Sequence, residues 1–325
     1  MNPRKKIARR RQAMMILLTL IISALGSING ARGEEFGSSL YIPGFQGPMA
    51  GYQPDPGTYL KNDFYWYQGN ATKLLLNGRV QFNMRTRLLA NLTTLFHVTN
   101  FKIFNANYGA SLIWADIANS FMKSEVEIDL RRLGRTLNLQ RQEDYTGVGD
   151  LIATPLMLGW HVGQFHLMAF GNLYCPTGAY NVHRVVNTSL HRWAVEPNLA
   201  VTWLDPKRGH EASLALGYTI NFENSATNYL TGNEFHLDFY LGQHLPKGFN
   251  LGLAGFLLKQ TTPDSGSGAH LGKFYGFTFG LGPCLQWNFT LAGHPLLLGA
   301  RYYNELAVHN RTSGQSMFGT FSFGF

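Results

Sequence analysis

From Thr58 onward the chain divides into segments in which apolar and polar side chains alternate. A β-strand points successive side chains to opposite faces, so a period of two predicts a strand with one apolar and one polar face. Residues 231–243 show this pattern clearly. Their apolar face consists of Phe235, Leu237, Phe239 and Leu241, and their polar face of Glu234, His236, Asp238 and Tyr240.

The alternation predicts about 12 strands, with about 14 as the alternative count. Their connections are alternately long and short, which is typical of barrels with long outer loops and short periplasmic turns. The longest connection, 119–146, carries charges of both signs, so we expect an exposed outer loop; folding inward to narrow the pore is the alternative. The predicted strands are 58–68, 79–97, 103–118, 147–160, 164–175, 192–204, 211–222, 231–243, 249–260, 272–288, 295–307 and 313–325.

After the first thirty or so residues no apolar run is long enough for a membrane-spanning helix, which needs about 20 residues. Yet 45% of the residues are hydrophobic and only 14% are charged. Backbone polar groups in lipid must pair internally, so a membrane protein without such helices closes a sheet on itself. The sequence therefore predicts an all-β fold, a transmembrane antiparallel up-and-down β-barrel over residues 58–325.

Residues 1–26 have the three parts of a secretory signal peptide. A front with only positive charges precedes an apolar stretch, 13–25, and small residues follow. We expect cleavage after Gly26, with Ala31 as the second choice and an uncleaved membrane anchor as the alternative. Much of the net charge of +8 lies in this front, so the charge gives no reason to expect nucleic acid as a partner. The charged residues of the front are Arg4, Lys5, Lys6, Arg9, Arg10 and Arg11.

The two ends of the expected mature chain carry different signals. Residues 27–57 are rich in Gly, Pro and Ser, which predicts an irregular periplasmic arm or partial plug, with a disordered lead-in as the alternative. At the other end, Phe321, Phe323 and Phe325 stand at every second position. An alternating last strand with a terminal Phe resembles the assembly signal of bacterial outer-membrane proteins. We therefore expect a location in the bacterial outer membrane, with its lipid and the barrel-assembly machinery as partners.

Charged residues within the predicted strands suggest a pore lining. Arg79, Arg85 and Arg87 share one face of their strand. An Arg that faces lipid at the bilayer centre costs about 2–4 kcal/mol, so we expect all three in the lumen. There they would attract anionic solutes or, alternatively, pair with acids and brace the wall. The same argument predicts pore-lining positions for Glu196, Glu234, His236, Asp238, Arg301 and Glu305.

Catalytic and metal chemistry have little support in the sequence. His236 and Asp238 share a strand face, so they could form a general base. However, no Gly-x-Ser-x-Gly elbow marks a nucleophile, and the histidines lack the His-Glu-x-x-His spacing of common metal sites. We therefore expect no enzyme, no catalytic residues, no metal and no cofactor. Cys175 and Cys284 fall near opposite ends of the predicted barrel, so we expect two free thiols.

Short motifs follow one another in a fixed order between residues 41 and 283. They are Tyr41-Ile42-Pro43-Gly44, Pro56-Gly57-x-Tyr59, Gly147-x-Gly149-Asp150, Pro155-x-x-Leu158-Gly159-Trp160, Pro176-Thr177-Gly178-x-Tyr180, Asn221-x-Glu223-Asn224, Thr227-x-Tyr229-x-Thr231-Gly232-x-Glu234-Phe235-His236-x-Asp238 and Gly282-Pro283. Together they resemble the outer-membrane family named after the meta-pathway of phenol degradation, also described as SphA-like transporters. The resemblance implies a porin-like role in the uptake of small apolar or aromatic compounds. An outer-membrane barrel hydrolase and a structural or adhesive barrel are the alternative functions.

Overall fold

A computed structural model describes residues 38–76, 79–130, 135–269 and 275–325, with the backbone alone described at 72–76, 79–82, 126–130 and 135–139. The expected signal peptide lies outside these residues. The regular elements of the described residues are strands, apart from a short 3-10 helix at Pro246–Gly248. The strands are β1 Gly57–Leu76, β2 Arg79–Ile103, β3 Ala106–Leu130, β4 Arg135–Gly147, β5 Leu151–Val162, β6 Phe165–Cys175, β7 Ala194–Asp205, β8 His210–Asn221, β9 Glu234–His244, β10 Phe249–Gln260, β11 Phe277–Leu291, β12 His294–His309 and β13 Ser313–Gly324.

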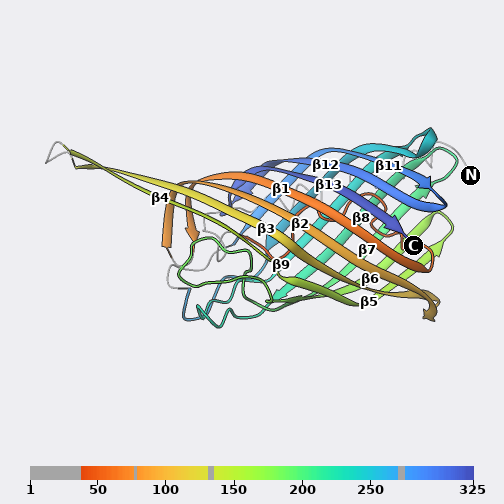
Figure 1. Cartoon of the computed structure of the whole chain (residues 1–325), viewed down its shortest axis with the longest axis horizontal. Coiled ribbons are helices and arrows are strands. Elements are labelled where there is room, and N and C mark those ends of the chain that lie inside the picture. Colours follow the sequence, from red (N-terminus) through yellow and green to blue (C-terminus); the bar gives the residue numbers. More distant parts are fainter. Residues whose placement is uncertain (1–37, 77–78, 131–134, 270–274) are drawn as a thin grey trace, which may run out of the picture. The chain divides into compact units, whose positions relative to one another are not determined.

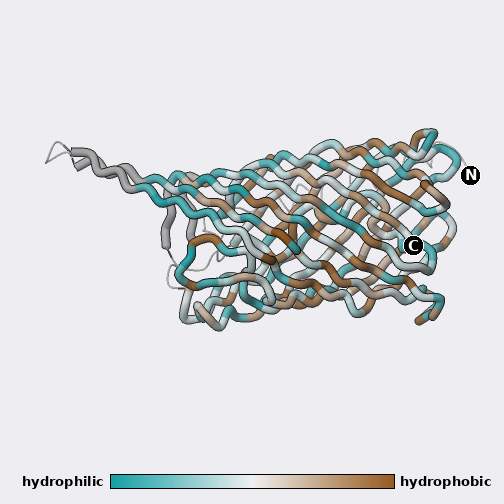
Figure 2. Tube along the Cα trace, in the orientation of Figure 1, coloured by the Kyte–Doolittle hydropathy of each residue, from teal (hydrophilic) through white to brown (hydrophobic). Residues whose placement is uncertain are grey.

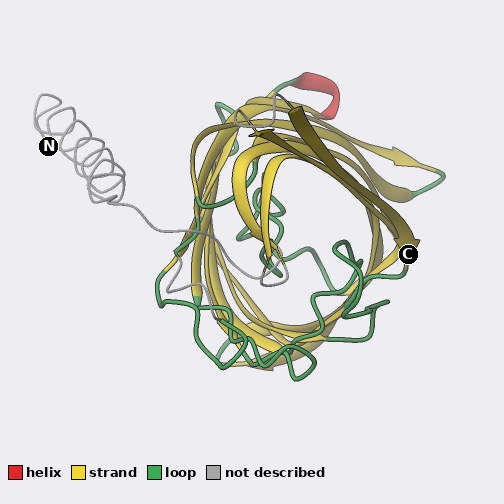
Figure 3. Cartoon of the chain, turned by 90° about the vertical axis from the view of Figure 1, so that its left-hand side faces the viewer, coloured by secondary structure: helices red, strands yellow, loops and turns green. Residues whose placement is uncertain are grey.

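Twelve of these strands form a closed antiparallel ring, which confirms the predicted barrel (Figure 3). Each strand pairs with its neighbour in the sequence, and β1 closes the ring by pairing with β13. The exception is β4, which pairs only with β3. Because β3 pairs with β5 along its first half and with β4 along its second half, β4 is an extra strand outside the ring.

The charged segment 119–146 is not the loop that the alternation predicted. Its residues continue β3 as far as Leu130 and return as β4, so only 131–134 separate the two strands. Figure 1 shows these strands running on together beyond the rest of the barrel, and Figure 2 shows that the part of them nearest the barrel is largely hydrophilic. A strand that leaves the lipid no longer needs an apolar face, so its residues lose the alternation by which it would be recognised.

Tight turns set the strand register at one end of the barrel, which we call the short-turn end. Phe104 and Asn105 join β2 to β3 with φ of 51° and 63°, and Ala292 and Gly293 join β11 to β12 with φ of 52° and 85°. Two-residue turns with positive φ match the right-handed twist of antiparallel strands. The opposite end, the long-loop end, carries the connections 176–193, 222–233 and 261–276.

The outer face of the ring is largely apolar. Side chains such as Leu199, Leu241 and Leu251 are about half exposed on it, while their sequence neighbours point into the barrel. The strands reach this apolar face by alternation, with polar or small residues turned inward. Among the described residues, the structure has no helix long and apolar enough to cross a membrane.

Candidate functional site

Residues 38–56, which we call the lumen segment, run inside the barrel before β1 begins. Near the long-loop end, the Ser39 hydroxyl accepts a hydrogen bond from Arg311 at 3.3 Å. Near the short-turn end, the Gly51 amide donates to Thr202 of β7 at 3.0 Å. Gly51 lies so close to the backbone of β6 and β7 that a Cβ would collide with it, which is a reason for glycine at this position. Gln53 is fully buried.

The carboxylate of Asp238 on β9 is the main anchor of the lumen segment. It accepts hydrogen bonds from the Tyr41 hydroxyl, from the Gly44 amide at 3.2 Å and from the Gln46 amide at 2.9 Å. Burial, reinforced by Asp238, raises the pKa of Tyr41 well above its ordinary value, so the hydroxyl stays protonated and donates. The Tyr41 ring also stacks on His236, with ring centroids 3.5 Å apart.

A second anchor comes from β12. Arg301 donates from Nη1 to the carbonyl oxygens of Gly44 at 3.0 Å and Phe45 at 2.8 Å, and the Tyr303 hydroxyl donates to Gly44 at 3.2 Å. Arg301 also faces Asp63 of β1, with Nη2 3.5 Å from Oδ1. The segment is therefore held by a carboxylate of β9 and a guanidinium of β12, three strands apart in the ring.

Glu196 on β7 connects the wall residues beneath these anchors. Its carboxylate lies 3.3 Å from Nε2 of His236 and accepts hydrogen bonds from Tyr174 at 3.0 Å and Thr219 at 2.7 Å. Because a buried carboxylate without partners would be costly, these contacts allow Glu196 to remain charged in the interior. The result is a braced wall that links β6, β7, β8 and β9.

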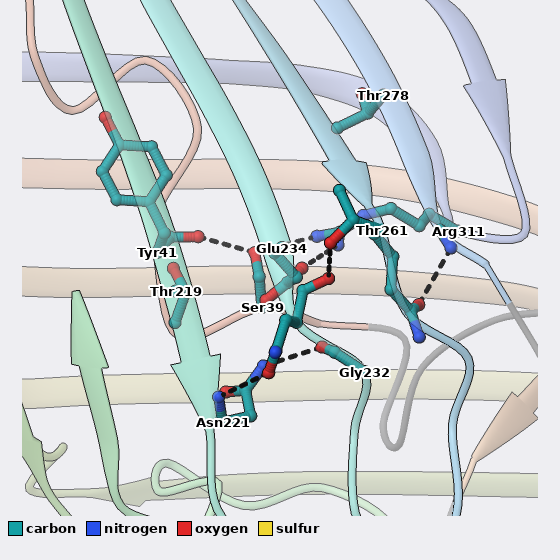
Figure 4. Close-up of polar contacts among 12 residues, drawn as sticks. Ser39, Tyr41, Thr219, Asn221, Gly232, Glu234, Thr261, Thr278 and Arg311 are labelled. Atoms are coloured by element: carbon teal, nitrogen blue, oxygen red, sulfur yellow. Dashed lines mark hydrogen bonds and ion pairs between the residues drawn. The ribbon is translucent and has the colours of Figure 1, made fainter. Parts of the chain in front are cut away.

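Acidic residues also form polar contacts at the long-loop end of the lumen. Glu234 lies 3.6 Å from Arg311, whose guanidinium also reaches Ser39 of the lumen segment (Figure 4). Glu305 accepts hydrogen bonds from the Gly314 amide at 2.6 Å and from Thr278 at 3.0 Å. These pairs join β9, β11 and β12 to β13 and to the connection that precedes it.

Two cavities lie beside the lumen segment, and Tyr41 and Arg301 of the anchors also border the larger one. The large cavity, about 690 Å³, reaches the short-turn end, and the small cavity, about 200 Å³, lies under the long-loop end. Phe170, Met157 and Met168 line the large cavity; Met84, Val185 and Val186 line the small one. The two cavities share the lining residues Leu40, Ile42, Leu92, Ile152 and Tyr174.

The family model described as "Putative MetA-pathway of phenol degradation" matches residues 67–321. The chain belongs to this family. Together with the closed barrel, this membership places the protein in the bacterial outer membrane. The short-turn end is then the periplasmic end, and the long-loop end faces outward.

One solved structure has the same fold with a TM-score above 0.5, and others are similar to a lesser degree. An outer membrane channel from Pseudomonas putida F1 matches with a TM-score of 0.64 and 16% identity, over 88% of this chain and all (100%) of that one. The transport unit of the autotransporter AIDA-I from Escherichia coli gives 0.41 and 9%, over 84% and 91% of the two chains. A TodX mutant described as a monoaromatic hydrocarbon channel gives 0.40 and 7%, over 92% and 97%. No curated protein matches the chain.

Six of the nine residues predicted to line the pore point into the barrel in this family member. They are Glu196, Glu234, His236, Asp238, Arg301 and Glu305. The structure brings most of them to the lumen segment or to partners within the wall, which is the bracing alternative. Whether any of them contacts a solute stays a prediction.

Two arginines of β2, Arg85 and Arg87, were assigned to the wrong face. Even-numbered residues of this strand, such as Met84 and Leu92, line the cavities, so Arg85 and Arg87 point outward. Arg85 is exposed, and Arg87 lies over the Phe121 ring at 5.3 Å. The exposed position of Arg85 opposite Lys123 of β3 indicates that this part of the wall lies outside the lipid, where an outward charge has no such cost. The side chain of Arg79 lies outside the described residues.

The remaining candidates are placed in ways that limit their chemistry. His236 and Asp238 are each only 1% exposed, with Glu196 3.3 Å from Nε2 of His236 and Tyr41 hydrogen-bonded to Asp238, so both side chains are covered by their neighbours. Cys175 and Cys284 are both free thiols, as predicted. Sequence reasoning missed the anchoring role of Tyr41, although its Tyr-Ile-Pro-Gly motif belongs to the resemblance and was a signal that could have found it.

Proposed function

We propose that this protein passes small, mainly apolar compounds through the outer membrane, along the side of the lumen segment that carries the two cavities. The observation that carries the proposal is their meeting at five shared lining residues, four of which are aliphatic. An apolar lining favours solutes that lose little hydration when they enter. The phenol-degradation description of the family supports aromatic compounds as the solute class.

The proposed route leaves the anchors of the lumen segment in place. The anchoring hydrogen bonds are made by Asp238 of β9 and Arg301 of β12. The shared cavity residues Leu92 and Ile152 belong to other strands, β2 and β5. A solute needs only side-chain movement where the cavities meet, because the segment backbone stays bonded on its far side. Side-chain rotation is far faster than release of a segment held by several charged contacts.

The route is tested by a substitution that narrows the passage where the two cavities meet. Leu92→Trp adds an indole to a side chain that is 5% exposed and lines both cavities. In proteoliposomes we expect uptake of small aromatic compounds to fall about tenfold, because the larger indole fills the space through which a solute would pass between the cavities. The matched control is Leu95→Trp, three positions along β2 but 40% exposed on the outer face. Equal uptake by the two variants, with both correctly folded, would contradict the proposed route.

A further inference from the structure

His161 and His166 form a pair at the periplasmic mouth of the lumen. They are directly opposed across the β5–β6 hairpin, whose two-residue turn has Gly163 at φ +61°. Alternation from Met157 on β5 and from Phe170 and Met168 on β6 turns both imidazoles inward. The pair is fixed by a short, regular hairpin, so its geometry is prepared before any ligand arrives.

The two rings present the same nitrogen to each other. Nδ1 of His161 lies 2.6 Å from Nδ1 of His166, a distance at which one ring donates its N–H to the lone pair of the other. A metal ion in place of that proton would receive both lone pairs. With bonds of about 2.0 Å, two nitrogens in cis positions of a square-planar or octahedral ion are about 2.8 Å apart, whereas a tetrahedral ion needs about 3.3 Å.

We propose that His161 and His166 form a binding site for a Cu²⁺-like divalent cation that prefers nitrogen ligands in cis positions. The observed separation is closer to the cis value than to the tetrahedral one, and imidazole affinity is highest for Cu²⁺ among first-row divalent ions. Binding requires the donating ring to move its proton from Nδ1 to Nε2, so both rings stay neutral and no net proton is released. Water completes the coordination, because His161 is exposed.

The histidine pair lies beside Tyr52, near the end of the lumen segment that reaches the short-turn end. The Tyr52 ring packs against both imidazoles, with centroid distances of 4.9 Å to His161 and 4.6 Å to His166. Among the described residues no group of three or more His, Cys, Asp or Glu side chains is placed to hold a metal. The pair is therefore a two-ligand site, of moderate affinity, rather than a closed structural site.

The experiment titrates Cu²⁺ into the mature protein, without a histidine tag, by calorimetry and electron paramagnetic resonance. We expect one site per chain, with a spectrum that shows two nitrogen ligands. His161→Ala and His166→Ala should each weaken binding at least about tenfold, since each removes half of the protein ligands. The matched control is His97→Ala, an exposed histidine of β2 that is bonded to Thr58 and should leave Cu²⁺ binding unchanged.

A second titration with Zn²⁺ tests the ion preference of the site. Zn²⁺ should bind less tightly than Cu²⁺, and the double variant His161→Ala/His166→Ala should bind neither ion above background. Heat-modifiable migration on gels verifies that each variant is folded, and His166→Gln replaces His166→Ala if that variant does not assemble. Equal Cu²⁺ affinity in wild type and folded double variant, or preference for Zn²⁺, would overturn the proposal.

Discussion

Tyr41 in the lumen segment donates its hydroxyl hydrogen bond to Asp238 of β9, which follows it by 197 residues in the chain. The same carboxylate accepts the amides of Gly44 and Gln46, so one buried charge holds a full turn of the segment. A hydrogen bond to a charged partner contributes about 1.5–3 kcal/mol. The Tyr41–Asp238 contact is therefore a principal tie between the lumen segment and the wall.

Tyr41→Phe should loosen the lumen segment without unfolding the barrel. The variant removes the hydroxyl and keeps the ring that stacks on His236. We expect faster hydrogen exchange at the amides of Gly44 and Gln46 and a higher single-channel conductance in planar bilayers. The control is Tyr218→Phe, whose hydroxyl contacts Thr261 instead. Unchanged exchange in Tyr41→Phe would show that the contact does not hold the segment.

Charge substitutions test which face of each strand meets lipid. Leu237 points outward on β9, between Leu216 and Leu257 of the neighbouring strands, so Leu237→Arg should cost about 2–4 kcal/mol and reduce assembled barrel. Arg85→Glu should assemble normally, because Arg85 is exposed opposite Lys123. Its ion selectivity should stay close to wild type. A large change in the ion selectivity of Arg85→Glu would show that the Arg85 side chain lines the lumen and would contradict its outward placement.

Deletion of Phe325 should sharply lower the amount of assembled barrel. Its amide donates to the Thr58 carbonyl at 2.9 Å, and its ring packs edge-on against Phe323. The residue thus closes the seam between β13 and β1, and it carries the resemblance to the signal for the assembly machinery. Membrane levels and heat-modifiable migration measure the effect. Phe325→Tyr keeps both contacts and should assemble; a deletion that behaves like this control would count against the prediction.

The mature protein should begin at Ser27. The tripartite pattern of residues 1–26 predicts cleavage after Gly26, and Ser39 is already inside the barrel, bonded to Arg311. Intact-mass spectrometry of protein from outer membranes measures the terminus directly. A mass that retains Arg9, Arg10 and Arg11 would exclude this cleavage.

Alternation along the chain was enough to predict the closed barrel and the inward direction of six polar residues. Strand periodicity is local, and lipid imposes one rule on every strand that crosses it: apolar outward and polar inward. That rule placed Glu196, His236 and Asp238 on the lumen face of their strands. It also separated them from Phe235 and Leu237, which the structure turns outward.

The features that this rule does not predict depend on contacts between parts of the chain that are far apart in sequence. Arg85 is exposed opposite Lys123 of β3. The alternation around it correctly predicted a strand, but not which face of that strand points into the barrel. Residues 119–146 became strands because β3 and β4 pair with each other, a contact that the charge pattern does not encode. The docking of Tyr41 on Asp238 joins positions 197 residues apart, and only the closed barrel brings them together. The cavities beside the lumen segment exist for the same reason, since they are bounded by residues from strands that the chain order keeps apart.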